Sequence, residues 1–175
     1  MNESVQERLA TATVGAEGGY YRLVLLVGAP RTGKTSVLRE TAEQLSCPVV
    51  NLNLTLCQSL LELTRKQRAL RVRKILAEEL GGLDAETVML DNIEVLFSPD
   101  LAQDPLRLLQ GLSRNQTIAA AWPGTFDETH LTYAEPGHPE WRRYSEPEAV
   151  IVTINQPTAP QSSVGHQMSE SREQR

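Results

Sequence analysis

The amino-acid sequence predicts a three-layer α/β/α fold around a parallel sheet. Short apolar runs alternate along the chain with longer segments whose apolar residues recur at helical spacing. Strands that alternate with helices pair in parallel, and right-handed crossovers place the helices on both faces of the sheet. The chain has 175 residues, of which 40% are hydrophobic, and this is enough for one core rather than two. We therefore expect a single α/β domain.

The first elements follow from apolar runs and from proline. Residues 22–27 (RLVLLV) form a continuous apolar run of the kind found in a strand that is covered on both faces. A helix is expected over residues 34–46, and Pro48 prevents its continuation. A second strand is expected over residues 49–54.

The second half of the chain continues this alternation. Gly81 and Gly82 mark the end of a long helix, and Pro105 suits the first turn of a shorter one. In order, the expected elements are a helix over residues 58–80, a strand over 87–90, a helix over 104–112, a strand over 117–121 and a last strand over 149–154.

Composition divides the chain into three parts. We expect residues 1–21 to form an N-terminal extension, residues 22–155 to form the domain, and residues 156–175 to be a disordered tail. The tail is polar and has almost no large apolar groups, so burial cannot offset the entropy of ordering it. Because no apolar run approaches the roughly 20 residues that cross a bilayer, and the start lacks a basic stretch before an apolar one, we expect a cytoplasmic protein without membrane contact.

The most informative motif follows the first strand, where residues 28–35 read GAPRTGKT. It matches G-x-x-x-x-G-K-[ST] between a strand and a helix, which is the phosphate-binding P-loop. Gly28 and Gly33 allow a tight turn whose backbone N–H groups point at phosphate oxygens. Lys34 would reach the terminal phosphates of ATP, and Thr35 would bind Mg²⁺. The expected nucleotide-binding residues are Gly28, Ala29, Pro30, Arg31, Thr32, Gly33, Lys34, Thr35 and Ser36.

A second metal-binding position is expected at Asp91. Residues 88–91 (VMLD) form an apolar strand that ends in an acid, the Walker B arrangement in which an aspartate holds Mg²⁺ through water. One expected strand lies between this motif and the P-loop. That spacing resembles the additional-strand class of P-loop ATPases (AAA+, STAND and RecA-like proteins), and it implies the strand order 5-1-4-3-2.

The residues after Asp91 make rapid ATP hydrolysis doubtful. Related ATPases often have a glutamate directly after the aspartate, whereas this chain has Asn92. An amide can orient water but cannot accept its proton. Glu94 is either the substitute or a solvated carboxylate, and Thr125 is the nearest hydroxyl for sensing the γ-phosphate. We expect slow hydrolysis that a partner accelerates.

The connection over residues 122–148 is long, and long excursions usually carry structure or function of their own. Residues 129–134 are a candidate hairpin arm. Arg142 and Arg143 are candidate arginine fingers for a neighbour's phosphate, although solvated arginines are the more common reading. The short polar segment after Ile154 cannot form the helical lid of AAA+ proteins, so we expect a second copy to cover the nucleotide in a homo-oligomer.

A strongly basic segment lies on the expected long helix. From Arg65 to Lys74 it carries six basic residues and no acid, although the chain has a net charge of −5. These charges point in several directions around a helix, which favours a solvated surface. The same cations are a candidate contact for DNA phosphates or for an acidic partner.

Five segments of the chain also form a recognisable set. They read GAPRTGKT, LTRKQRALRV, MLDNIEVLF, DPLRLLQGLSRN and HLTYAEPGHPEWRRY. Together they resemble BrxF, the small P-loop protein of type 3 BREX bacteriophage-exclusion systems, from about Leu23 to Ile154. The resemblance implies a component of a multi-protein antiviral system that works beside a DNA methyltransferase, a helicase-like protein and other partners.

Three functions are consistent with these residues. The first is an ATP-dependent switch or assembly subunit of such a system. The second is a small nucleotide kinase, which the chain length suggests; the inserted strand before Asp91 and the lack of a recognisable arginine-rich lid count against it. The third is a DNA-binding adaptor with a structural nucleotide.

Overall fold

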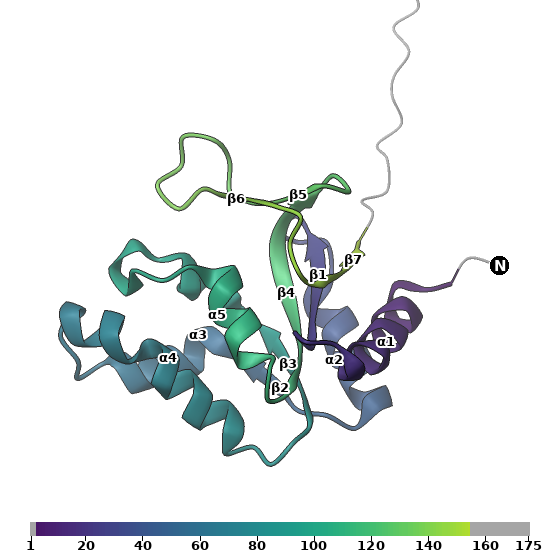
Figure 1. Ribbon diagram of the computed structural model, residues 1–175, viewed down its shortest axis with the longest axis horizontal. Coiled ribbons are helices and arrows are strands. Elements are labelled where there is room, and N and C mark those ends of the chain that lie inside the picture. The colour runs from purple at the N-terminus through teal and green to yellow at the C-terminus, as the bar shows by residue number, and fades with distance from the viewer. Residues whose placement is uncertain (1–2, 155–175) are drawn as a thin grey trace, which may run out of the picture.

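The computed structural model describes residues 3–154, and these form a three-layer α/β/α fold (Figure 1). The helices are α1 (Val5–Gly15), α2 (Lys34–Leu45), α3 (Leu52–Leu60), α4 (Arg65–Gly81) and α5 (Pro105–Leu112), with 3-10 turns η1 (Ala16–Gly18), η2 (Ile93–Phe97) and η3 (Pro99–Leu101). The strands are β1 (Leu23–Gly28), β2 (Val49–Asn51), β3 (Thr87–Asp91), β4 (Thr117–Phe126), β5 (His130–Tyr133), β6 (Arg142–Ser145) and β7 (Val150–Thr153). Within this range, no helix combines the length and hydropathy needed to span a bilayer.

The main sheet has the order β2-β3-β4-β1-β7, and all of its strand pairs are parallel. With β7 as the fifth strand of the expected sheet, this confirms the predicted order 5-1-4-3-2. The register places Leu25 of β1 between Ala120 of β4 and Ile151 of β7. In residues 3–154, no helix follows α5.

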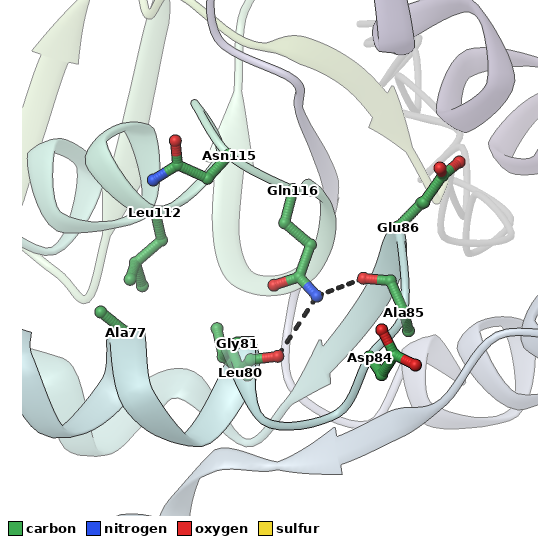
Figure 2. Close-up of a pocket in the computed structure, with 9 residues that line it drawn as sticks. All are labelled: Ala77, Leu80, Gly81, Asp84, Ala85, Glu86, Leu112, Asn115 and Gln116. Atoms are coloured by element: carbon green, nitrogen blue, oxygen red, sulfur yellow. Dashed lines mark hydrogen bonds between the residues drawn. The ribbon is translucent and has the colours of Figure 1, made fainter.

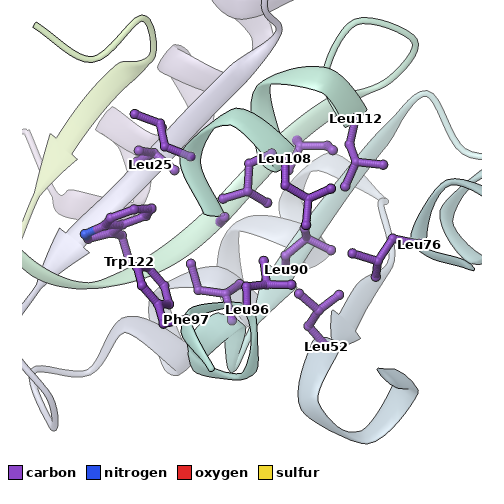
Figure 3. Packing of buried hydrophobic residues seen from close by; sticks show 14 of the residues in the cluster. Leu25, Leu52, Leu76, Leu90, Leu96, Phe97, Leu108, Leu112 and Trp122 are labelled. Carbon is purple, nitrogen blue, oxygen red and sulfur yellow. The ribbon is translucent and has the colours of Figure 1, made fainter. Parts of the chain in front are cut away.

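Both faces of the sheet are covered by helices. Leu25 and Val27 of β1 belong to the cluster beneath α3, α4 and α5, while Val24 and Leu26 belong to the cluster beneath α1 and α2. Figure 3 shows the packing of the larger cluster, with Leu25, Leu76 and Leu108 from three different elements. The continuous apolar run of β1 follows from this burial on both faces.

The prediction for residues 49–80 was partly wrong. β2 ends at Asn51, whose side chain accepts a hydrogen bond from Leu54 N at 3.2 Å and begins α3. The expected long helix is broken after α3, because Thr64 begins α4 with a capping box shared with Gln67. Polar caps of this kind satisfy the free N–H groups of a new first turn.

An antiparallel arm extends from the carboxyl end of β4. The strand was predicted to end at residue 121, but it continues through Gly124 to Phe126 and pairs with β5, which pairs with β6. A Cβ atom at Gly124 would lie 1.8 Å from Thr132 O, so only glycine fits there. The predicted hairpin over residues 129–134 is only partly confirmed, because these residues form the single strand β5, whose antiparallel partners β4 and β6 lie on either side of it in the sequence. We call β5, β6 and their connection the arm.

The first residues of the chain add a helix to the smaller cluster. Ser4 and Glu7 form a capping box at the start of α1, and Leu9 is fully buried. Arg8 Nη2 donates a hydrogen bond to Thr153 O at 2.8 Å, which joins α1 to β7. The expected tail over residues 156–175 lies outside the described residues.

Candidate nucleotide site

The predicted phosphate loop lies at the carboxyl edge of the sheet, between β1 and α2. Gly33 has φ +90°, a left-handed conformation that glycine adopts without strain. A Cβ atom at Gly28 would lie 2.7 Å from Thr32 Oγ1, so any other residue there would displace the Thr32 hydroxyl. Thr32 Oγ1 in turn donates to Ala29 O at 2.7 Å and holds the loop closed on itself.

The Lys34 side chain lies over the mouth of this loop. Its Nζ donates hydrogen bonds to Gly28 O at 2.8 Å and to Ala29 O at 2.7 Å. Burial lowers the pKa of Lys34, and the nearby carboxylates of Glu94 and Asp91 oppose that shift. A cation is therefore held between the loop and two acids.

A cavity of about 430 Å³ is lined by residues of both the P-loop and the Walker B motif. It is lined by Pro30, Arg31, Gly33, Lys34, Thr35, Asp91, Asn92, Glu94 and Ala121. Thr35 and Asp91 contribute hydroxyl and carboxylate oxygens, which are the ligands that Mg²⁺ prefers. The residues present therefore fit Mg-ATP. Of the predicted loop residues, Gly28, Ala29, Thr32 and Ser36 do not line this cavity.

The turn after β3 directs Glu94 toward the same cavity. Asp91 is buried, and its Oδ1 accepts a hydrogen bond from Asn92 N at 2.9 Å. Asn92 has φ 53° and ψ 52°, a left-handed conformation that asparagine tolerates better than most residues. The chain then enters η2, where Glu94 is exposed and lines the cavity.

The end of β4 places no hydroxyl in this first cavity. Its lining residue there is Ala121, while the indole of Trp122 points to the opposite face of the sheet, where it is fully buried. Thr125 Oγ1 lies 2.5 Å from Thr132 Oγ1, on an exposed part of the arm. The predicted sensor is therefore engaged with the arm and does not face Lys34.

A second cavity, of about 480 Å³, lies between the P-loop and the arm. Pro30 and Glu94 line both cavities, so the two are neighbours. The other lining residues are Ala29, Pro123, Gly124, Thr125, Thr132, Tyr133, Ala134, Glu135, His138 and Glu140. Sequence reasoning did not identify this cavity; its one signal was the unusual length of the connection over residues 122–148.

The two candidate arginine fingers lie on β6 of the arm. Neither Arg142 nor Arg143 lines the first or the second cavity. Arg142 Nη1 donates to Trp141 O at 3.1 Å. These arginines therefore do not contribute to the lining of the chain's own nucleotide cavity.

Several residues of the basic segment on α4 make contacts within the fold. Arg65 forms an ion pair with Asp100 at 2.7 Å, and Arg68 Nε donates to the carbonyls of Leu60 and Leu63, each at 3.0 Å. Lys74 lies 3.7 Å from Glu78. These contacts reduce the free positive charge of the segment.

A third cavity, of about 290 Å³, lies at the opposite edge of the sheet, beside the start of β4 (Figure 2). The Gln116 side chain extends into this cavity, and its Nε2 donates hydrogen bonds to Leu80 O at 3.3 Å and to Ala85 O. No residue predicted to act in catalysis or binding lines this cavity.

A comparison with protein families agrees with this site. Residues 24–120 match the model of the ATPase family associated with various cellular activities (AAA). A solved structure described as C. elegans PCH-2 is similar at 18% sequence identity and a TM-score of 0.49. The similarity covers 88% of this chain but only 42% of that one. No curated protein sequence matches the chain. The matched residues contain the P-loop and Asp91, and the chain belongs to the AAA family of ATPases.

Proposed function

We propose that the chain binds Mg-ATP, hydrolyses it slowly, and acts as a nucleotide-dependent switch or assembly component of a BREX-type anti-phage defence system. The observation that carries this proposal is the first cavity, in which Lys34, Thr35 and Asp91 meet. Membership of the AAA family supports nucleotide binding and ATPase chemistry.

The proposed binding mode uses groups that are already in place. The N-terminus of α2 and the N–H groups of the loop stabilise phosphate charge. Lys34 would exchange its bonds to Gly28 O and Ala29 O for bonds to phosphate oxygens. Thr35 and Asp91 would hold Mg²⁺, which neutralises charge on the phosphates during hydrolysis.

The proposal of slow hydrolysis rests on the residue after Asp91. Asn92 lines the first cavity, where its amide can orient water but cannot accept a proton. Glu94 is the carboxylate of η2 that lines the same cavity, and we assign it the role of base. Because Glu94 is exposed, a partner that orders it would accelerate turnover.

The role in a defence complex rests on the segments that resemble BrxF. GAPRTGKT and MLDNIEVLF supply the first cavity, and HLTYAEPGHPEWRRY forms the arm. Since Arg142 and Arg143 lie on the arm and do not line their own nucleotide cavity, we propose that they reach the site of a neighbouring copy in a homo-oligomer.

Calorimetry and mass determination in solution test this function. The chain should bind Mg-ATP and form a larger assembly with a non-hydrolysable analogue. Lys34→Ala should lose both properties, whereas Arg142→Ala should keep ATP binding and lose turnover. No heat of binding on titration of Mg-ATP into the unmodified chain would refute the proposal.

The two alternative functions agree less well with the geometry. If the chain were a nucleotide kinase, the phosphate-carrying substrate that accepts the phosphoryl group would enter the second cavity. That cavity is lined by Glu94, Glu135 and Glu140, whose negative charges would repel the substrate's phosphate. A DNA adaptor would rely on α4, where Arg65 and Arg68 are engaged within the fold.

A further inference from the structure

The turn that carries Glu94 is held at its far end by the arm. Phe97, the last residue of η2, is fully buried. Its ring stacks on Tyr133 of β5 with centroids 3.5 Å apart and planes 15° apart. The same ring meets Trp122 edge-on at 5.1 Å, and Figure 3 shows these two side chains next to each other. Aromatic contacts therefore connect η2 to both β4 and β5.

Tyr133 also lies close enough to Glu94 for its phenol to feel the charge of that carboxylate. Both residues line the second cavity. The Tyr133 hydroxyl donates to Glu140 Oε2 at 3.4 Å, close to the upper limit for a hydrogen bond. Burial, Glu140 and Glu94 raise the pKa of Tyr133 to about 12, so its phenol keeps its proton at neutral pH. The residue thus presents a neutral donor in a cavity rich in carboxylates.

Glu94 lines the first and the second cavity and so lies at their shared boundary. Its carboxylate interacts electrostatically with both the Lys34 ammonium and the Tyr133 phenol. The arm itself is fixed to β4, since Trp122 Nε1 donates to Thr132 O at 2.9 Å. Movement of η2 therefore cannot occur without a change around Trp122 and Tyr133.

We propose that Tyr133 is a positioning residue for the phosphate site: its contact with Phe97 sets where Glu94 points and transmits nucleotide-dependent movement of η2 to the arm. Tyr133 would not contact the reacting atoms itself and would act on them through η2. The inference rests on the proposed function, because it needs ATP in the first cavity.

Trp122 provides a direct measurement of this coupling. The chain has two tryptophans, so Trp141→Phe leaves Trp122 as its single fluorescent reporter beside Phe97. Mg-ATP binding is measured by calorimetry, the response of η2 by Trp122 emission, and turnover by phosphate release. The test variants are Tyr133→Leu and Tyr133→Phe. Tyr144→Leu is the matched control, since within residues 3–154 that ring contacts Trp122 at 5.9 Å but not Phe97.

Mg-ATP should change Trp122 emission in the Trp141→Phe parent. Tyr133→Leu should abolish that change and lower turnover on the order of tenfold, because a displaced catalytic group is costly, while Kd stays within about twofold. Tyr133→Phe keeps the ring and should restore most of both properties. Tyr144→Leu should keep the ATP-induced change even if its resting emission differs.

Three results would overturn the inference. They are a parent that binds Mg-ATP without a Trp122 response, a Tyr133→Leu variant that responds like the parent, and a Tyr133→Leu variant that loses ATP binding together with turnover. A parent that gives no heat with Mg-ATP would instead show that the proposed function has failed. Calorimetry on the parent therefore separates the two failures.

Discussion

The phosphate loop and the arm lie side by side around Glu94, but different contacts hold them. The loop is closed by neighbours in sequence, since Thr32 and Lys34 bond to carbonyls no more than six residues before them. The arm is held by remote residues: Tyr133 stacks on Phe97, and the Tyr144 hydroxyl donates to Asp104, 40 residues away, at 3.1 Å.

From this difference we expect the loop to determine phosphate binding and the arm to determine how the site responds to changes elsewhere in the fold. A loop that is shaped by its own backbone can hold phosphate whatever the rest of the chain does. An arm that depends on distant contacts can respond to a change elsewhere in the fold, because those contacts are formed between elements that move separately. We expect substitutions in the loop to change affinity, and substitutions in the arm to change stability and turnover.

The largest effect is expected from Gly124→Ala, in the part of β4 that pairs with the arm. The added methyl group would lie 1.8 Å from Thr132 O, a backbone atom that cannot move without breaking the β4–β5 pairing. We expect a loss of at least about 4 kcal/mol in the free energy of unfolding, measured by urea denaturation. Gly15→Ala is the control, because nothing lies within 4 Å of its new methyl group. Equal stability of the two variants would mean that the arm does not depend on this close approach.

Lys34→Ala should have the next largest effect, on binding rather than on folding. Removing the cation leaves phosphate charge without its main partner, and we expect Kd for Mg-ATP to rise roughly a hundredfold. The urea midpoint should change little, because the lost contacts are two bonds to loop carbonyls. Lys66→Ala, an exposed lysine of α4, is the matched control. If Lys34→Ala lowered stability and left Kd intact, the comparison of loop and arm would be reversed.

Much of the fold was predictable because its signals are local. The apolar run of β1, the glycines of the P-loop and the acid at the end of β3 each fix a structure within a few residues. The strand order was implied by the resemblance to the additional-strand class of P-loop ATPases, and the sheet confirms it. The structure likewise brings Lys34, Thr35, Asp91, Asn92 and Glu94 to one cavity.

The remainder could not be predicted, because its causes are remote in sequence. Nothing near Thr125 indicates that its hydroxyl would pair with Thr132. Nothing near Tyr133 indicates that it would stack on Phe97. The boundary between α3 and α4 was missed for a different reason. Thr64 and Gln67 have the spacing of a capping box, which marks the start of a helix. That signal was local but was outweighed by the helical pattern on both sides.

Thr64→Ala tests whether this local cap matters as the structure indicates. The Thr64 hydroxyl accepts a hydrogen bond from Gln67 N at 3.3 Å, and Gln67 Oε1 accepts one from Thr64 N at 2.9 Å. Loss of the cap should lower the free energy of unfolding by about 1 kcal/mol and leave Kd for Mg-ATP unchanged. Thr55→Ala, within α3, serves as the comparison. A cost well above that value would show that the start of α4 also supports the site.

The smallest effect concerns pH and two tyrosines of the arm, the buried Tyr133 and the half-buried Tyr144. Burial and nearby carboxylates raise the pKa of Tyr133 from 10 to about 12, and burial and Asp104 also raise the pKa of Tyr144. A raised pKa means that the folded state holds the proton more tightly, so this stabilisation is complete below pH 10 and is lost as pH rises toward 12. Unfolding free energy should therefore fall more steeply between about pH 10 and about pH 12 for the unmodified chain than for Tyr133→Phe. Because the variant keeps the ring, equal slopes would mean that the hydroxyl faces solvent and that only the contact with Phe97 joins the arm to the site.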